Sequence, residues 1–442
     1  MLKTFEPPRL DLLSARPGNP QGRRTAASKD PVRDVAGVPV SELTEKYGSP
    51  LFVYDEAEMK RNLRTWKQAF ETLYQPVRFG WSYKTCYLRG VCKSFHGEGS
   101  MAEVVSEMEY EKARQLGVPG KEIILNGPHK RPAFLKRALS EGATLHIDHF
   151  DEVDDVLALA DESEQILKVG IRVNMDAGIQ PVWSRFGFHL ESGEARQALT
   201  QLLRHPRIRL SGLHCHIGTY ILEPVAYATV TRKLLELAYW AEDTFDQRIE
   251  HLDLGGGFPS PARLKGIYQS PDVYLPKPSE YAEAVVNALQ ENLRPGHRPL
   301  LLLESGRAMV DSAGTLLTSV LARKAMPDGR DLVVMDAGVN VLYTATWYEM
   351  QPAVTKRYDT GRHSTQLVGP LCMNIDVLHD DWMLPPLDRG DTLLIPNVGA
   401  YNVTQSMQFI VTRPAVVMIH TDGSQEVIRR AETLSDIEAG ES

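Results

Sequence analysis

Short apolar runs alternate with helical patterns between about residues 78 and 304. Each run is rich in β-branched and aliphatic side chains, and the stretch after it has the i, i+3, i+4 spacing of a helix. We count eight such runs, at 78–83, 101–105, 122–125, 144–147, 167–173, 208–213, 249–254 and 299–303. Eight successive strand–helix units predict the α/β class and a parallel (β/α)8 TIM barrel.

Two helices can be located from their starts. Ser106 and Glu109 have the spacing of a capping box ahead of a helix that ends near Gly117. Asp55 precedes a second helix. Its apolar stripe consists of Met59, Leu63, Trp66, Phe70 and Leu73.

The pattern changes after Arg307. Runs at 332–335, 366–368, 392–395 and 415–419 are separated by turn residues and have little helical periodicity. We therefore expect a barrel over residues 51–310 and a C-terminal β-rich domain over 311–442.

Composition narrows the class of protein. With 43% hydrophobic and 24% charged residues and no apolar run long enough to span a bilayer, the chain is not expected to be a membrane protein. The net charge of -8 includes no basic stripe, so we expect no nucleic-acid partner. Residues 1–31 lack the apolar core of a secretory signal and read as a mobile lead-in, which favours the cytoplasm. The four cysteines form no CxxC pair.

Polar or glycine residues gather just past the ends of the predicted strands. In a barrel of this type that face carries the chemistry. The residues are Lys84, Glu103, Ser106, Asn126, Asp148, Asn174, His214, His216, Gly255–Gly257, Glu304 and Arg307.

Three glycines end the seventh strand, in the stretch from His251 to Pro259. Glycine lets the backbone approach a ligand, and successive amides in such a turn bind anions. Gly255–Gly257 thus indicates a phosphate site, although a plain flexible turn has the same sequence.

Lys84 follows the first barrel strand among aromatic and small residues. A partly desolvated lysine is a competent amine nucleophile for a Schiff base, whereas a lysine that reaches into solvent has no such role. Glu304 at the end of the last strand can pair with a protonated ring nitrogen, and Arg307 can hold a phosphate, although the two can equally form a local ion pair.

The remaining motifs are weaker when taken singly. His214 and His216 point the same way, but no third ligand is visible, so no metal site is predicted, and an imidazole can also stack on a flat ring. Cys372 alone reads as a core thiol and Tyr401 as a core or rim aromatic. No Ser/His/Asp order favours a hydrolase.

Taken together, these motifs resemble those of the fold type III pyridoxal phosphate enzymes, the alanine racemase-like group that contains diaminopimelate, ornithine and arginine decarboxylases. The resemblance runs from about residue 52 to 409. Five motifs occur in the family's order: Tyr83-Lys84, His214-x-His216-Ile217-Gly218-Thr219, Leu254-Gly255-Gly256-Gly257-Phe258, Glu304-x-Gly306-Arg307, and Gly369-Pro370-x-Cys372 with Gly399-Ala400-Tyr401.

The resemblance implies a role for each motif. Lys84 would bind pyridoxal 5'-phosphate as a Schiff base, His216 would stack on its ring and Glu304 would pair with the ring nitrogen. Cys372 would reach the site of the second subunit of a homodimer, and residues 1–50 would partly belong to the β domain. The phosphate would be held by Gly255, Gly256, Gly257, Thr219, Arg307 and Tyr401, with threonine at 219 where the family usually has serine.

The implied reaction is decarboxylation of an amino acid. A carboxylate keeps the ring nitrogen protonated and the ring electron-accepting, whereas racemases of this layout use an arginine there, so Glu304 favours loss of CO2. Cys372, or a water that it positions, would return a proton to Cα.

The expected substrate contacts depart from the family pattern. The acidic residue that follows the cysteine in diaminopimelate and ornithine decarboxylases is Met373, and the arginine that grips the distal carboxylate of diaminopimelate aligns with Thr344. Ser305 replaces a proline. Arg185 and Asp376 are further candidate substrate contacts, although Arg185 can equally be a solvated arginine.

A thioether cannot balance an ammonium group, so we hypothesise a substrate whose distal amine is masked, such as the siderophore precursor citryl-diaminopropionate. Decarboxylation of diaminopimelate or of a basic amino acid is the alternative. A catalytically silent relative that acts by binding a partner is a further alternative, which the presence of Lys84, Glu304, Arg307 and Cys372 disfavours.

Overall fold

The computed structural model describes residues 30–180, 183–267 and 269–441, which divide into two compact units. The first unit comprises Met1–Glu58, Ser260–Leu275 and Val310–Ser442, of which residues 1–29, 268 and 442 are not described. The second comprises Met59–Pro259 and Pro276–Met309, without 181 and 182. The predicted mobile lead-in therefore lies almost wholly outside the described residues.

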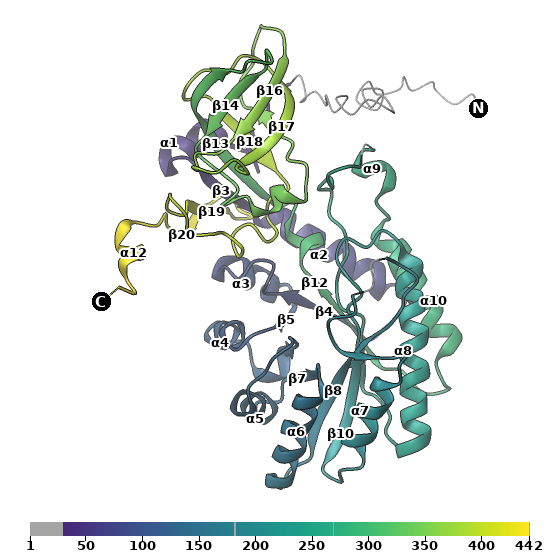
Figure 1. Ribbon diagram of the computed structural model, residues 1–442. Helices are drawn as coiled ribbons and strands as arrows, with labels where there is room; N and C mark the ends of the chain where they lie inside the picture. Colours follow the sequence, from purple (N-terminus) through teal and green to yellow (C-terminus); the bar gives the residue numbers. More distant parts are fainter. Residues whose placement is uncertain (1–29, 181–182, 268, 442) are drawn as a thin grey trace, which may run out of the picture. The chain divides into compact units, whose positions relative to one another are not determined.

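The second unit is built around a closed ring of eight parallel strands, and each overlaps one predicted run (Figure 1). Neighbours follow the order β10-β11-β12-β4-β5-β6-β7-β8, and pairing of β8 with β10 closes the ring. The predicted TIM barrel is confirmed. The strands are β4 Val77–Ser82, β5 Met101–Val104, β6 Ile123–Leu125, β7 Thr144–Ile147, β8 Leu167–Asn174, β10 Ile208–His214, β11 His251–Asp253 and β12 Leu300–Ser305, with a short β9 Phe188–His189 beside β8.

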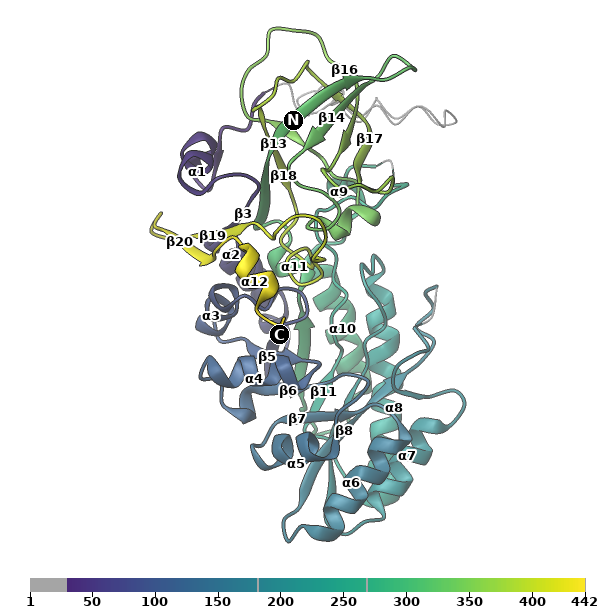
Figure 2. The same cartoon turned by 60° about the vertical axis from the view of Figure 1, so that its left-hand side comes forward.

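Helices surround this ring on the outside (Figures 1 and 2). The predicted cap of α4 is confirmed, because the Ser106 hydroxyl accepts from the Glu109 amide at 3.2 Å. Leu73 was wrongly placed on the apolar stripe of α2, since that helix ends at Glu71 and Leu73 is 42% exposed. The helices are α2 Glu56–Glu71, α3 Arg89–Gly97, α4 Glu107–Gln115, α5 Pro132–Ser140, α6 Phe150–Glu162, α7 Glu194–Leu203, α8 Pro224–Phe245, α10 Pro278–Asn292 and α11 Arg307–Val310, with the 3₁₀ turn η2 Gly120–Glu122.

The first unit is β-rich, as predicted, and β13 (Gly314–Ala325) is its central strand, pairing with β3, β14 and β18. The N-terminal strand β3 (Leu51–Asp55) lies between β13 and β19. The other elements are β1 Asp34–Val35, β2 Val38–Pro39, α1 Val40–Tyr47, α9 Pro271–Tyr274, β14 Asp331–Met335, η3 Tyr343–Thr346, β15 Ala353–Val354, β16 His363–Val368, β17 Val377–Leu384, β18 Thr392–Pro396, β19 Ala415–Ile419, β20 Gln425–Arg429 and α12 Leu434–Glu438.

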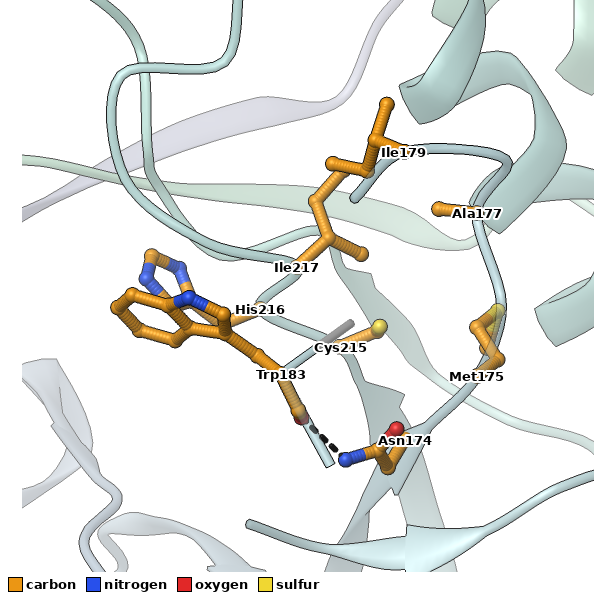
Figure 3. Close-up of a pocket in the computed structure, with 8 residues that line it drawn as sticks. All are labelled: Asn174, Met175, Ala177, Ile179, Trp183, Cys215, His216 and Ile217. Atoms are coloured by element: carbon orange, nitrogen blue, oxygen red, sulfur yellow. Dashed lines mark hydrogen bonds between the residues drawn. The ribbon is translucent and has the colours of Figure 1, made fainter. Parts of the chain in front are cut away.

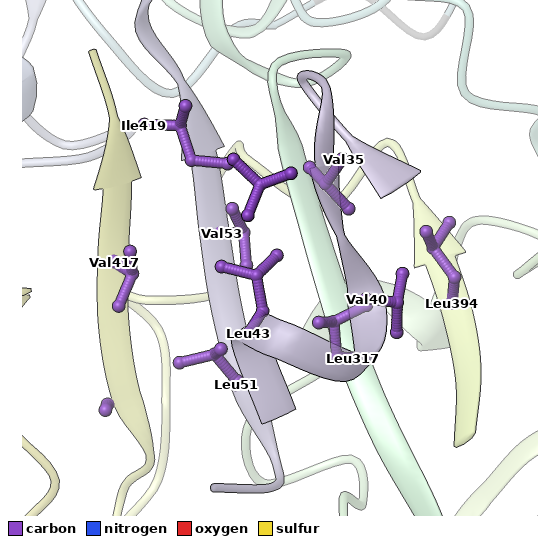
Figure 4. Packing of buried hydrophobic residues seen from close by; sticks show 11 residues of the cluster. Val35, Val40, Leu43, Leu51, Val53, Leu317, Leu394, Val417 and Ile419 are labelled. Carbon is purple, nitrogen blue, oxygen red and sulfur yellow. The ribbon is translucent and has the colours of Figure 1, made fainter. Parts of the chain in front are cut away.

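The core of this unit joins segments that are far apart in the sequence. Leu43 of α1 and Val53 of β3 pack with Leu317 of β13, Leu394 of β18 and Val417 of β19, all buried (Figure 4). Burial of each such side chain stabilises the fold by about 1.5–3 kcal/mol. The described residues before the barrel are thus integral to the β unit.

No helix among the described residues is both long and apolar enough to cross a membrane.

Candidate active site

Lys84 lies directly after β4, and its ammonium group is held by Glu103 on the next strand. Lys84 Nζ donates to both carboxylate oxygens of Glu103, at 2.9 and 2.8 Å. The register of the two strands places Ser82 opposite Glu103, so the two ends meet at the same height in the barrel. Glu103 is fully buried, whereas the Lys84 side chain is 36% exposed. The amine is therefore positioned by a buried negative charge at the barrel mouth.

Glu304, near the end of β12, is 4% exposed and is surrounded by polar side chains. Its Oε1 accepts from Asn126 Nδ2 at 2.5 Å, and its Oε2 lies 3.5 Å from His214 Nε2. Burial opposes ionisation, but the His214 imidazole and the Lys84 ammonium hold the pKa of the Glu304 carboxyl well below its usual value. Glu304 is thus a fixed negative charge inside the barrel.

Asp253 on β11 is a second buried carboxyl beside that charge. It is fully buried, and one of its oxygens accepts from the Gly255 amide at 2.9 Å. Burial, and then the negative charge on Glu304, raise the pKa of Asp253 well above its usual value. The negative charge of the pair is therefore favoured on Glu304 over Asp253.

Ligand atoms of Asp253, Glu304 and His146 lie within 4.8 Å of one another, close enough for a metal ion. Both ring nitrogens of His146 are already hydrogen-bonded, however, to Asn126 at 2.8 Å and to His251 at 2.9 Å. An imidazole so engaged has no lone pair left for a metal.

His216 follows β10 and is fixed by the glycine loop. Its Nδ1 accepts from the Gly256 amide at 2.9 Å, so the ring is the Nε2–H tautomer. Burial, and then the charges of Arg172 and Lys84, lower the pKa of His216 well below its usual value. The imidazole is therefore neutral and suited to stacking on a flat ring.

Only glycine fits at position 256. A Cβ there would lie 1.9 Å from the carbonyl oxygen of Glu304, and the Tyr227 hydroxyl donates to the Gly256 carbonyl at 2.8 Å. The amides of Gly255 and Gly256 are used inside the protein, by Asp253 and His216. The amide of Gly257, the third glycine, has no hydrogen-bond acceptor among the described residues.

The remaining anion-binding candidates of this unit follow β10 and β12. A Cβ at Gly257 would meet the carbonyl oxygen of Gly218 at 2.5 Å, so the loops after β10 and β11 touch. Thr219, next to Gly218, is exposed. Arg307, two residues after β12 ends, is 9% exposed.

A pocket opens beside His216 (Figure 3). The Trp183 indole lies beside the His216 imidazole, with ring centroids 5.6 Å apart and ring planes 66° apart. The backbone carbonyl of Trp183 accepts a hydrogen bond from the side chain of Asn174. The candidate substrate residue Arg185 is exposed and lies over the Phe186 ring. The lining residues are Asn174, Met175, Ala177, Ile179, Trp183, Cys215, His216 and Ile217.

The other sequence-predicted site residues belong to the β unit. Cys372 is exposed and Met373 partly buried, in the turn between β16 and β17. Asp376 is 2% exposed, and its two oxygens accept from the amides of Val339 and Leu371, each at 2.8 Å. Burial raises the pKa of this carboxyl. Its oxygens therefore support the Cys372 turn rather than face a substrate.

Thr344 and Tyr401 also lie in the β unit. The amide and hydroxyl of Thr344 both bond Asn402 Oδ1, at 3.1 and 2.9 Å, and the residue is 2% exposed. The hydroxyl of Thr344 is thus engaged within the unit. Tyr401 is partly buried and adopts a left-handed φ of 67°.

Sequence reasoning assigned no role to several buried polar side chains inside the barrel. Glu103 and Asn126 were noted only as polar residues near the ends of predicted strands. His146 stands within an apolar strand run, which could have indicated a buried polar side chain inside the barrel. His251 alternates with Asp253, so the two side chains are expected on the same face of their strand. Arg172, 9% exposed on β8, has the charge that acts on His216.

The barrel, and the chain as a whole, are similar to known proteins. Residues 56–311 match the family model described as "Pyridoxal-dependent decarboxylase, pyridoxal binding domain". The diaminopimelate decarboxylase of Bacillus subtilis (strain 168) is 30% identical over 424 residues, 91% of this chain and 94% of that protein. That of Actinosynnema pretiosum subsp. auranticum is 32% identical over 424 residues, 91% of each. The crystal structure of the M. jannaschii diaminopimelate decarboxylase with L-lysine has a TM-score of 0.84 and 26% identity, and the match covers 94% of this chain and 98% of that one.

Proposed function

The chain belongs to the pyridoxal-dependent decarboxylase family, and on that premise we propose that Lys84, Glu304 and His216 form its reaction centre. It is a pyridoxal phosphate-dependent amino acid decarboxylase, a carboxy-lyase. The relatives named diaminopimelate decarboxylase support an enzyme over the alternative of a catalytically silent binding protein.

The residues of the barrel mouth fit pyridoxal phosphate. A primary amine, a buried carboxylate with a depressed pKa and a neutral imidazole are what its aldehyde, ring nitrogen and ring face need. The Gly257 amide, Thr219 and Arg307 supply donors for its phosphate. Gly255 and Gly256 contribute by close approach, since their own amides are occupied. Tyr401 is a further proposed phosphate contact, for which the family resemblance is the support.

When bound, pyridoxal phosphate supplies the electron-accepting ring that takes up the electron pair left as carbon dioxide departs. The Lys84 amine would hold the cofactor. Glu304 would balance a protonated ring nitrogen with its negative charge. His216, fixed by the Gly256 amide, would offer a neutral imidazole to the cofactor ring. Cys372 is the proposed donor of the proton to Cα.

We further propose that the substrate is a diamino acid of the diaminopimelate class. The support comes from relatives named diaminopimelate decarboxylase that align over nine-tenths of both chains. The test is CO2 release by the purified holoenzyme from meso-diaminopimelate, L-lysine, L-ornithine and an acylated diaminopropionate at equal concentrations. Turnover of meso-diaminopimelate at least about tenfold above the others supports the proposal.

A second candidate substrate is an amino acid with a masked distal amine, of the citryl-diaminopropionate type found in siderophore synthesis. Two positions favour it. Met373 offers a thioether where an ammonium would need an acid, and the Thr344 hydroxyl is engaged by Asn402. Preference for the acylated substrate in the same assay selects this candidate, with Arg185 and Met373 as the proposed contacts.

We also propose that the enzyme is a cytoplasmic homodimer with shared sites, in which Cys372 serves the partner's Lys84. Mixing inactive K84A and C372A proteins under conditions of subunit exchange tests this. Half of the dimers then pair unlike subunits, and each has one intact site of two, so about a quarter of wild-type activity returns. No recovery, with exchange verified by mass spectrometry, contradicts the shared site.

A further inference from the structure

Asn126, directly after β6, lies between the two carboxylates of the barrel mouth. Its Nδ2 donates to Glu304 Oε1 at 2.5 Å and lies 3.3 Å from Glu103 Oε1. The side chain is 2% exposed, so water does not compete for these contacts. One amide group therefore bridges the carboxylate that holds Lys84 and the carboxylate proposed to meet the ring nitrogen.

The orientation of this amide is determined by chemistry. An ionised carboxylate only accepts hydrogen bonds, so the NH2 group of Asn126 must face Glu304. Asn126 Oδ1 then faces His146 Nδ1 at 2.8 Å and must accept from it. His146 is consequently the Nδ1–H tautomer.

His251 completes the chain. Its Nε2 lies 2.9 Å from His146 Nε2, and one of these two nitrogens must donate. Burial lowers the pKa of His146 well below its usual value and that of His251 to about 4, so both rings are neutral near pH 7. Since the single proton of His146 is on Nδ1, His251 donates. The hydrogen bonds run in one direction, from His251 through His146 and Asn126 to Glu304.

The strands next to the two rings leave room for them. A Cβ at Gly212 of β10 would lie 2.2 Å from His251 Nε2, and a Cβ at Gly170 of β8 would lie 2.6 Å from His146 Cδ2. The His146 ring also stacks on that of His214, with centroids 4.9 Å apart and planes 19° apart. The backbone is thus shaped to hold the imidazoles in place.

We propose that His251, His146 and Asn126 are positioning residues that fix the Glu304 carboxylate and keep it separated from Glu103. Without the histidine pair, Asn126 is free to turn its carbonyl oxygen toward Glu304, where two oxygens repel. The inference rests on the proposed role of Glu304, but the tautomers on which it depends are properties of the protein alone.

The first test reads these tautomers. In protein labelled with 15N-histidine and free of cofactor, magic-angle-spinning NMR at pH 7 should show His146 protonated at Nδ1 and His251 at Nε2, assigned by loss of signals in H146N and H251Q. An Nε2–H form of His146, or a protonated imidazolium at either position, overturns the proposal. If Glu304 does not act at the ring nitrogen, E304Q keeps full activity, but the tautomers read by NMR are unchanged. Failure of the proposed function and failure of the hydrogen-bond chain are therefore distinguishable.

The second test separates positioning from packing. H251F fills the space without a donor and should lower kcat about tenfold, with KM changed by less than about twofold, and shift the pH profile of the visible absorbance of the bound cofactor. H251Q retains a donor near the Nε2 position and should restore most of kcat. Equal kcat for H251F and wild type, or equal losses in H251F and H251Q, contradicts the relay.

The matched control is H297Q. His297 is also buried, at 7% exposure, and bonds the Ile249 carbonyl at 3.1 Å, away from Glu304. This variant should leave kcat and the absorbance profile unchanged. If it reproduces the H251F profile, the effect is one of general destabilisation and the proposal fails.

Discussion

Glu103 accepts two hydrogen bonds from the Lys84 ammonium while it is itself fully buried. A buried carboxylate is costly unless its charge is balanced, and the Lys84 ammonium supplies that balance at hydrogen-bond distance. The position of the amine in the barrel mouth thus depends on the neighbouring strand as well as on its own.

Replacement of Glu103 tests this dependence. E103Q retains a hydrogen-bond acceptor but removes the charge, and a charge-assisted hydrogen bond contributes about 1.5–3 kcal/mol. We expect kcat/KM to fall roughly 10- to 100-fold and cofactor binding to the apoenzyme to weaken, measured by fluorescence titration. E98Q, at the exposed ion pair with Arg64, is the control and should behave as wild type. An unaltered E103Q enzyme refutes the role of the ion pair.

Lys84 itself should be indispensable. K84A removes the amine that binds the cofactor and should abolish CO2 release, and the visible absorbance of the purified protein should move to that of non-covalently bound pyridoxal phosphate. K233A, a surface lysine paired with Glu191, serves as the comparison. Decarboxylation at the wild-type rate in K84A would show that another group carries the reaction.

Glu109 predicts a pH dependence of stability. Burial first, and then the charge of Glu103, raise its pKa to about 7, although the Val105 amide opposes this. The unfolded value is lower, so the protonated group stabilises the fold below about pH 4.5, and this contribution is lost as pH rises to 7. The free energy of unfolding of E109Q should therefore rise, relative to that of wild type, by up to about 3 kcal/mol between pH 5 and 8.

Urea denaturation of the apoenzyme at both pH values measures this gain. E107Q, in the same helical turn but with a side chain 39% exposed, controls for loss of a carboxylate. A constant difference between E109Q and wild type across the range would be inconsistent with a raised pKa.

Met373 offers a test of the substrate assignment. M373E places a carboxylate where a distal ammonium would need one, on a partly exposed turn that tolerates a charge. If the distal amine of the natural substrate is masked, this change should raise kcat/KM for diaminopimelate about tenfold and lower it for the acylated substrate. M373Q, similar in size but uncharged, should do neither. Loss of activity toward diaminopimelate in M373E supports the unmasked substrate instead.

The sequence predicted the barrel because each of its strands is a local pattern. The capping of α4 by Ser106 and the position of the glycine turn followed for the same reason. The contacts between strands could not be predicted. Lys84 and Glu103 are brought together by pairing of β4 with β5, and Asn126 and Glu304 are 178 positions apart in the chain.

Two predictions made from local sequence patterns also differ from the structure. Leu73 continued the apolar stripe of α2, but the helix had already ended, which no periodicity reveals. The three amides of the glycine turn were expected to face a phosphate. Asp253 and His216 use two of them, because side chains of the protein compete with a ligand for the same donors.

A Cβ at Gly170 would lie 2.8 Å from the carbonyl oxygen of Gly212 as well as against the His146 ring, so glycine is required there whatever residue stands at 146. Gly212 differs, because the atoms nearest to a Cβ at 212 all belong to the His251 ring. Alanine at 212 collides with the imidazole of a histidine at 251 but not with a smaller residue there. A homologous sequence can therefore exchange Gly212 only after, or together with, His251. Positions 212 and 251 constitute an epistatic pair, in which the order of substitutions is constrained even where the final combination is stable.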